Sequence, residues 1–558
     1  MADNKLSKRN LYSFAASNIG RDLACQGLFT GQLLNYVYFT KNLDSTQFAA
    51  LTIIMAAARI FDAFNDLAMG NIIDATRSKW GKFKPWIFAG MIGSGIVIIA
   101  EFSNKLQGWN YVIFFGFMYF LYSIVFTMND ISYWGMVPSL ARNANDRNRL
   151  SSLTALCANI GIGIGGIIVP ILTTGALAIN GSAVYGYMLT SVVFVVLFFI
   201  LQSTTLIGVK ENRNEDYYGK GEKVSLKGIV QLFKENDQLR WVAVVFFLSQ
   251  LVPGAAYTMY IYFQFGYNGT LLTLFYAFSS VATVVINLFY PTIAKKFSRK
   301  QLMRFAMWAQ IIGNILVLAV AIFVPKGFCS FVIPIFGAEV TLQFILMAFA
   351  YFFCGWAGTS FYMVLMICIA NTTEYNQYKS GKRNEGIISS TRAFLVKLGS
   401  ALVTLGMTLF YIIIGVNDET NKIADYEQMA SMGTITAEEK LNGINEIIAN
   451  IPDAKTFGIL LFATVVPCVL YVAAYAIFSK KYIITEEYFE EISTALKTRT
   501  PHKPRKHNEI SQNYLQNGYR PFKLTHNGSR FCRKRFFGKK CRSRKNQGYP
   551  LRLACQNG

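Results

Sequence analysis

Long apolar runs constrain what this chain can fold into more strongly than any other feature of its sequence. A helix that crosses the hydrocarbon core of a bilayer needs about 20 mostly apolar residues. Twelve such runs lie near residues 11–40, 47–74, 86–104, 110–138, 151–178, 184–207, 237–264, 268–294, 301–324, 342–371, 386–416 and 456–480. Because 53% of the residues are hydrophobic and only 15% are charged, a disordered chain is excluded and a soluble multidomain enzyme nearly so. The predicted fold class is all-α, a polytopic membrane protein with twelve transmembrane helices.

Basic residues lie in alternate loops between these runs. They follow the second, fourth, eighth and tenth runs, at 77–84, 142–149, 295–300 and 379–383. The intervening loops are short and nearly uncharged, or acidic as at 418–453. Since Lys and Arg mark cytoplasmic loops, we expect a multi-pass protein of the plasma (inner) membrane with both termini in the cytoplasm. The first run is longer than the apolar region of a cleavable signal peptide, so we expect it to remain as a span.

The longest predicted cytoplasmic connection divides the twelve runs into six and six. We therefore expect an N-terminal six-helix bundle (1–209), a middle loop (210–236), a C-terminal six-helix bundle (237–498) and a tail (499–558). Two halves around a site at the middle of the membrane are typical of secondary transporters.

The tail differs from the body in composition. From Pro501 onward fifteen Lys and Arg stand against one acid, Glu509, and all three histidines of the chain lie there. We expect a disordered cytoplasmic arm attracted to anionic lipid headgroups, with no nucleic-acid partner, because basic disorder alone is unspecific. The body contains no histidine, and its cysteines lack metal-ligand spacing, so His-based catalysis and zinc sites are not indicated there.

Ionisable residues inside a spanning helix are costly and therefore mark candidate functional sites. The second run contains Arg59, Asp62, Asn65 and Asp66, and the three charged residues share one helical face through spacings of three and four. Two carboxylates one turn apart in a low dielectric favour a bound cation or a proton, and the Asn amide adds an oxygen ligand. The alternative is a structural Arg–Asp ion pair between helices, and both interpretations can hold together.

A second polar face lies on the fourth run. Thr127, Asp130 and Trp134 are spaced by three and four, and the first run adds Arg21 and Asp22. A carboxylate beside an indole ring is a common way to bind a sugar, since the acid accepts from hydroxyls and the ring stacks on C–H groups. A Trp that anchors the membrane interface is the alternative.

Two further patterns concern the eleventh and fifth runs. Arg392 and Lys397 are five residues apart, so they lie on different faces of their helix and need not serve one site. GIGIGG at 161–166 satisfies the dinucleotide fingerprint formally, but it lies inside an apolar helix with no preceding strand. We expect these glycines to allow close helix packing instead.

Three segments together resemble the signatures of the glycoside–pentoside–hexuronide:cation symporter family, within the major facilitator superfamily. They are RIFDAFNDLAMGNIIDATRSKWGKFKPW, FTMNDISYWGMVP and EYNQYKSGKRNEGIISSTRAFLVKLGSAL. The resemblance covers about residues 21–478 and implies two pseudosymmetric bundles, alternating access, and sugar uptake coupled to Na⁺, Li⁺ or H⁺. It implies a cation-binding site at Asp62, Asn65, Asp66 and Thr127, with Asp62 and Asp66 as the metal ligands. It also implies a sugar-binding site at Arg21, Asp22, Asp130 and Trp134, with Lys397 near both sites.

The chain departs from the best-known member of that family at several positions. Ala155 stands where that member has a sugar-contacting arginine, and Arg392 stands where it has glutamine. We hypothesise that Arg392 is substrate-binding and receives an anionic group such as a hexuronate carboxylate. A neutral glycoside remains an alternative.

The function predicted is cation-coupled symport of a glycoside, pentoside or hexuronide by a protein that is not an enzyme and needs no resident cofactor beyond the coupling ion. The expected partners are a small-molecule sugar, a monovalent cation (Na⁺ or H⁺) and the lipid bilayer, and the expected oligomeric state is a monomer. The alternatives are a symporter of another solute, such as a lysolipid, and a membrane enzyme.

Overall fold

The computed structural model describes residues 6–141, 144–210, 226–333, 338–381 and 385–498, all of which belong to one compact unit. The predicted tail (499–558) and most of the predicted middle loop lie outside the described residues.

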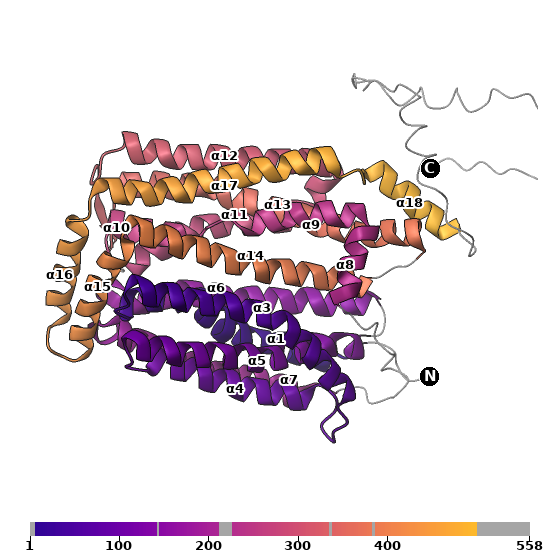
Figure 1. Cartoon of the computed structure of the whole chain (residues 1–558), viewed down its shortest axis with the longest axis horizontal. Coiled ribbons are helices and arrows are strands. Elements are labelled where there is room, and N and C mark those ends of the chain that lie inside the picture. The colour runs from indigo at the N-terminus through magenta and orange to yellow at the C-terminus, as the bar shows by residue number, and fades with distance from the viewer. Residues whose placement is uncertain (1–5, 142–143, 211–225, 334–337, 382–384, 499–558) are drawn as a thin grey trace, which may run out of the picture. The chain divides into compact units, whose positions relative to one another are not determined.

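Within the described residues, ten helices are long and apolar enough to cross a membrane. Figure 1 shows them side by side along one common direction. They are α3 (Ser45–Ala75), α4 (Lys84–Ser103), α5 (Gly108–Leu140), α6 (Ala144–Thr173), α7 (Ala183–Gly208), α11 (Gly269–Lys296), α12 (Arg299–Phe323), α13 (Leu342–Ser380), α14 (Glu385–Ile414) and α17 (Asp453–Lys481).

The other two predicted spans are interrupted helices, and each is the first span of its half. Residues 11–40 fall within α1 (Lys8–Asp22), the π-helix η1 (Leu23–Thr30) and α2 (Gly31–Thr40). Residues 237–264 are divided between α9 (Asp237–Gln250) and α10 (Ala256–Phe265). The second break contains Pro253, which has no backbone N–H to continue a helix. The twelve predicted spans thus correspond to ten unbroken and two interrupted helical segments.

Glycines of the GIGIGG segment explain how the π-helix fits. A Cβ atom at Gly161 would lie 2.3 Å from the carbonyl oxygen of Ile19, and one at Gly165 would lie 2.7 Å from Cα of Gly27. Both contacts are too short for any other residue, so the backbones of α6 and of the first span touch directly. The expected packing role is therefore confirmed for Gly161, while Gly163 and Gly166 have no atom within 4 Å of such a Cβ.

Short elements lie at the two ends of the bundle (Figure 1). The acidic loop 418–453 contains two helices that the sequence analysis did not predict, α15 (Val416–Ser431) and α16 (Ala437–Ala449), which form a hairpin at one end. Two other helices, α8 (Leu226–Glu235) and α18 (Glu486–Thr498), lie at the opposite end. In the part of the chain that the structure describes, a small antiparallel pair, β1 (Phe331–Ile333) with β2 (Ala338–Val340), departs from the all-α prediction.

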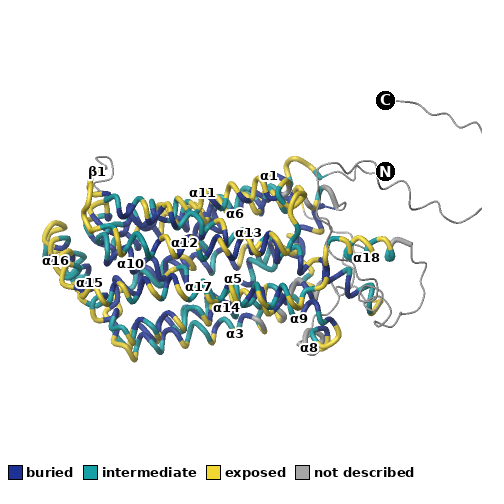
Figure 2. The backbone as a smooth tube through the Cα atoms, turned by 90° about the horizontal axis from the view of Figure 1, so that it is seen from above, coloured by how far each residue is buried: buried dark blue, intermediate teal, exposed yellow. Residues whose placement is uncertain are grey.

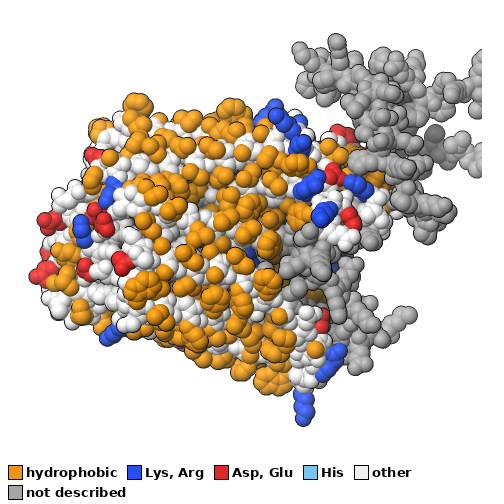
Figure 3. Space-filling view, in the orientation of Figure 1, with side chains coloured by type: hydrophobic (Ala, Val, Ile, Leu, Met, Phe, Trp, Pro, Cys, Tyr) orange, Lys and Arg blue, Asp and Glu red, His pale blue; other side chains and the backbone are white. Residues whose placement is uncertain are grey.

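The surface of the bundle is strongly apolar between its ends. In Figure 3, hydrophobic side chains cover the middle of the molecule, and charged side chains gather toward both ends. Ile96 and Phe117, which lie well inside α4 and α5, remain 60% and 67% exposed. Figure 2 shows dark-blue, buried segments inside the bundle. An exposed apolar surface this extensive indicates contact with lipid rather than with water.

Candidate functional site

A buried ion cluster joins the first span to α5. The Arg21 guanidinium donates from Nε to Oδ1 of Asp22 at 3.0 Å and from Nη1 to Oδ1 of Asp130 at 3.0 Å. Arg21 and Asp22 are almost completely buried, while the side chain of Asp130 is 37% exposed. Asp22 also accepts from Nδ2 of Asn18 at 3.2 Å. Arg21 thus bridges an enclosed carboxylate, that of Asp22, and a partly exposed one, that of Asp130.

Two aromatic rings flank this cluster. The Arg21 guanidinium lies 4.7 Å from the ring centroid of Tyr133 and 5.8 Å from that of Trp134. Trp134 is 37% exposed and packs edge-on against Tyr133. The structure therefore brings Arg21, Asp130 and Trp134 together, with an accessible carboxylate next to an accessible indole ring.

The acid pair of α3 has two different environments. Asp62 is buried, accepts a hydrogen bond from the Ser123 hydroxyl of α5, and lies 3.6 Å from Nη1 of Arg59. Nδ2 of Asn65 donates to the backbone carbonyl of Ser123 at 3.3 Å. An Arg–Asp ion pair is thus present, but it lies within α3 rather than between helices, and it occupies only one of the two acids.

The second acid connects the two halves of the protein. Asp66 accepts from the Thr127 hydroxyl of α5 at 3.0 Å and from Nζ of Lys397 on α14 at 2.5 Å. The side chains of Asp66 and Lys397 are 33% and 26% exposed. Because Lys397 belongs to the second half, Asp66 faces the interface between the halves rather than lipid.

The charges of this group balance. Two carboxylates, Asp62 and Asp66, face two cations, Arg59 and Lys397. Among the residues that the structure describes, no three His, Cys, Asp or Glu side chains meet as a metal cluster. A bound alkali ion would therefore need neutral oxygens, such as those of Asn65 and Thr127, and would compete with Lys397 for Asp66.

Arg392 is placed apart from these groups. Its Nη1 donates to the Tyr362 hydroxyl at 3.3 Å and approaches the Met366 sulfur at 3.8 Å, and both residues lie on α13. Lys397 reaches α3 instead. The two side chains thus contact different helices, as their five-residue spacing predicts.

Ser123 and Tyr133 belong to the site but were not predicted from the sequence. Ser123 lies four residues before Thr127, so the spacing that united Thr127, Asp130 and Trp134 extends one turn further to it. The same spacing could therefore have identified Ser123 from the sequence. Nothing in the sequence pointed to Tyr133, whose ring supports Arg21 only through the packing of α1 on α5.

The two halves also meet at the end of the bundle that carries the α15–α16 hairpin. The hydroxyls of Thr52 on α3 and Thr408 on α14 lie 3.0 Å apart. The Asn42 amide donates to Oδ1 of Asp425 on α15 at 2.7 Å. Within the hairpin, Glu427 pairs with Lys440 at 2.9 Å and also accepts from the backbone N–H of Ala183 at 2.6 Å. The hairpin follows α14 in the second half, and these contacts bind it to the first half.

Comparison with known proteins identifies the family of this chain. The family model described as "MFS/sugar transport protein" matches residues 22–486. A lactose permease of Lactobacillus delbrueckii subsp. bulgaricus is 27% identical, over 87% of this chain and 72% of that protein. A raffinose carrier protein of Pediococcus pentosaceus is 25% identical, over 88% and 71% of the two chains. An isoprimeverose transporter of Lactiplantibacillus pentosus is 25% identical, over 68% and 76%.

Solved structures support the same fold. The nucleoside transporter NupG superposes with a TM-score of 0.51 at 13% identity, over 85% of this chain and 99% of that one. A D-xylose-proton symporter superposes with a TM-score of 0.50 at 14% identity, over 79% and 98%. The chain belongs to the glycoside–pentoside–hexuronide:cation symporter family, with the major facilitator fold, and is therefore a membrane transport protein rather than an enzyme.

Proposed function

We propose that this protein imports a sugar together with a monovalent cation by alternating access. The observation that carries the proposal is Asp66, which is held between Thr127 of the first half and Lys397 of the second. Because this carboxylate contacts both halves, a change in its charge would change how strongly the two halves are held together.

The charge balance supports cation coupling. Arg59 and Lys397 balance the charges of Asp62 and Asp66. A cation that binds at these acids would therefore add an unbalanced positive charge unless Lys397 moves away from Asp66. Na⁺ at Asp62, Asn65, Asp66 and Thr127, or a proton on Asp66, would release the lysine and loosen the contact between the halves. By linkage, sugar and cation would then increase each other's affinity by the same factor.

The sugar site is proposed at Arg21, Asp22, Asp130 and Trp134. Asp130 and Trp134 are each about one-third exposed and lie on one face of α5, which suits hydroxyl recognition by the acid and stacking on the ring. Relatives named for lactose, raffinose and isoprimeverose make a glycoside the first class to test. A lysolipid would require an apolar lining instead.

The orientation proposed is with both termini in the cytoplasm of a cell whose plasma membrane holds the protein. Lys295, Lys296 and Arg299 lie at the α8–α18 end, where Arg299 pairs with Glu486 of α18 at 3.5 Å. The opposite end carries the acidic hairpin. An excess of basic residues at the α8–α18 end is typical of the cytoplasmic side.

Reconstituted transport tests this proposal. The purified protein in proteoliposomes should accumulate one of the three sugars named above, driven by an imposed Na⁺ gradient or an imposed pH gradient. We expect Asp66→Cys to abolish accumulation but to leave sugar exchange, because exchange needs no net cation movement. Asp418→Cys, which removes an exposed acid of the hairpin, is the matched control.

Two results would contradict the proposal. Gradient-driven accumulation that persists in both Asp62→Cys and Asp66→Cys would remove these acids from coupling. Sugar movement by the unmodified protein that ignores both gradients would show a uniporter.

A further inference from the structure

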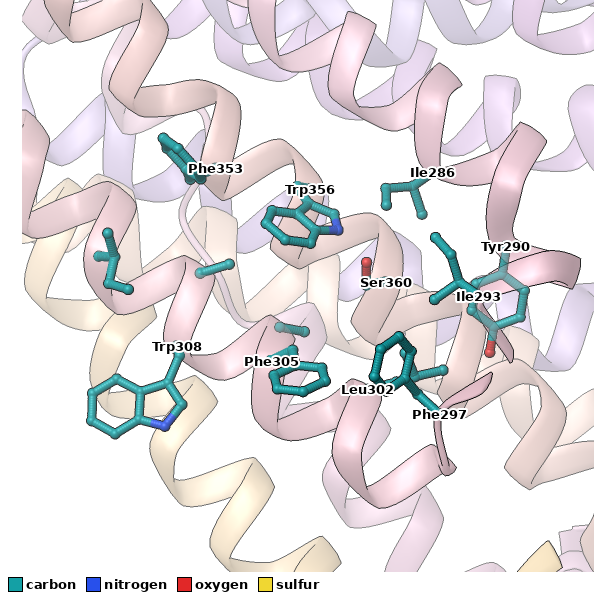
Figure 4. Close-up of a pocket in the computed structure, with 13 residues that line it drawn as sticks. Ile286, Tyr290, Ile293, Phe297, Leu302, Phe305, Trp308, Phe353, Trp356 and Ser360 are labelled. Carbon is teal, nitrogen blue, oxygen red and sulfur yellow. The ribbon is translucent and has the colours of Figure 1, made fainter. Parts of the chain in front are cut away.

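A groove of about 490 Å³ lies in the second half, away from the site described above. Its walls come from α11, α12 and α13, and apart from Ser360 every side chain that lines it is aliphatic or aromatic. Figure 4 shows Ile286, Tyr290 and Ile293 on one side, Phe305 and Trp308 on the other, and Trp356 with Ser360 between them. The volume is within the range of small-molecule pockets.

The groove exists because two consecutive helices diverge. Only Phe297 and Ser298 separate α11 from α12, yet over their described residues the two helices pack against α13 rather than along one another. The rings of Phe297 and Phe305 meet edge-on near the turn, with centroids 5.5 Å apart. Trp308 stays 52% exposed and Trp356 36% exposed at the open side. The hollow therefore opens toward the surrounding lipid.

The length of the groove matches one leaflet. On α12 it extends from Leu302 to Ile312, a rise of about 15 Å at 1.5 Å per residue. Half of a hydrocarbon core about 30 Å thick is also about 15 Å. A single acyl chain thus fits the groove along its full depth in that leaflet.

The end of the groove near the turn is positively charged. Lys296 closes α11 one turn after Ile293, and Arg304 lies one turn before Trp308, so both flank the lip. Both are exposed, and the Arg304 guanidinium lies 5.8 Å from the ring centroid of Phe305. No Asp or Glu occurs between residues 286 and 312. An apolar slot with a basic lip at headgroup depth complements a negatively charged lipid.

We propose that this groove is a binding site for an anionic glycerophospholipid. One acyl chain lies against Trp356 and Phe305, and the phosphate lies between Lys296 and Arg304. In the orientation proposed above, the lipid belongs to the cytoplasmic leaflet.

Native mass spectrometry of the delipidated full-length protein tests the site. Phosphatidylglycerol should remain bound at collision energies that remove phosphatidylcholine of the same chains. Lys296→Gln/Arg304→Gln should weaken phosphatidylglycerol binding about fivefold for each charge removed. The matched control is Lys295→Gln/Lys300→Gln, which removes the same charge from the same helix ends. These two lysines do not flank the groove, because Lys295 lies on the opposite face of α11 and Lys300 donates to the Ser479 carbonyl. This control should bind as the unmodified protein does.

A third variant separates the acyl chain from the charge. Ala309→Phe fills the groove and keeps both cations, so it should weaken binding of both lipids. Equal retention of the two lipids by the unmodified protein, or an equal loss in the control variant, would overturn the proposal. So would a dimer that forms and excludes lipid from this face. The charge variants lie on the surface, which keeps the test decisive if Ala309→Phe does not fold.

Discussion

The buried ion pair of the hairpin offers a quantitative test of how the two halves are held together. Lys440 on α16 and Glu427 on α15 are both completely buried, with 2.9 Å between Nζ and Oε1. Substitution of Lys440 by Met removes the amine and leaves the carboxylate in a dry environment. Breaking such a pair costs about 3–5 kcal/mol. Glu427 keeps the N–H of Ala183, so we expect the lower limit, about 3 kcal/mol.

Hydrogen exchange measures this loss locally. A cost of about 3 kcal/mol lowers the closed population of the hairpin about a hundredfold relative to its open state. Amides of α15 and α16 should therefore exchange up to a hundredfold faster in Lys440→Met, while amides of α4 stay unchanged. Lys422→Met, which removes a largely exposed partner of Glu419 in the same hairpin, should change exchange by less than about fivefold.

A double variant distinguishes the ion pair from simple packing. Glu427→Gln combined with Lys440→Met leaves no unpaired charge and keeps an oxygen that accepts from the N–H of Ala183, so protection should largely return. The reasoning is refuted if Lys440→Met exchanges like the unmodified protein, or if the double variant is no better protected than the single one.

Three further outcomes follow from the same structure. Thr127→Val removes the hydroxyl that Asp66 accepts from, and we expect about tenfold weaker activation of transport by Na⁺, measured as the concentration for half-maximal uptake, with sugar exchange intact. Arg392→Gln should reduce uptake of a glucuronide but not of a neutral glycoside, and unchanged glucuronide uptake would exclude Arg392 as the anion receptor. Burial lowers the pKa of Lys41 to about 8. Between about pH 8 and 10.5 the unfolded chain therefore binds a proton that the folded chain does not. The free energy of unfolding should rise with pH over that range by about 3 kcal/mol at most. Thermal unfolding of Lys41→Met across that range should lack this rise.

Much of the architecture could be predicted from the sequence because a bilayer requires long apolar helices. Ten of the twelve predicted spans correspond to unbroken helices with ends shifted by a few residues, except where α6 begins earlier and α13 continues to Ser380. The two interrupted spans were not predicted from the sequence, and the π-helix packs closely against α6, where Gly27 lies against Gly165. The hairpin was missed because its acidic residues resemble a loop, although Thr436 and Glu439 form a capping box there.

The sequence by itself determined which side chains can share a face, since a helical repeat of 3.6 residues places Asp62 with Asp66 and Asp130 with Trp134. It could not determine which partner each acid takes. Only the tertiary structure brought Lys397 to Asp66, across more than 300 residues of chain, and left Asp62 to Arg59. Contacts between residues so far apart in the chain depend on how the two bundles pack against each other. No local sequence pattern predicts that packing.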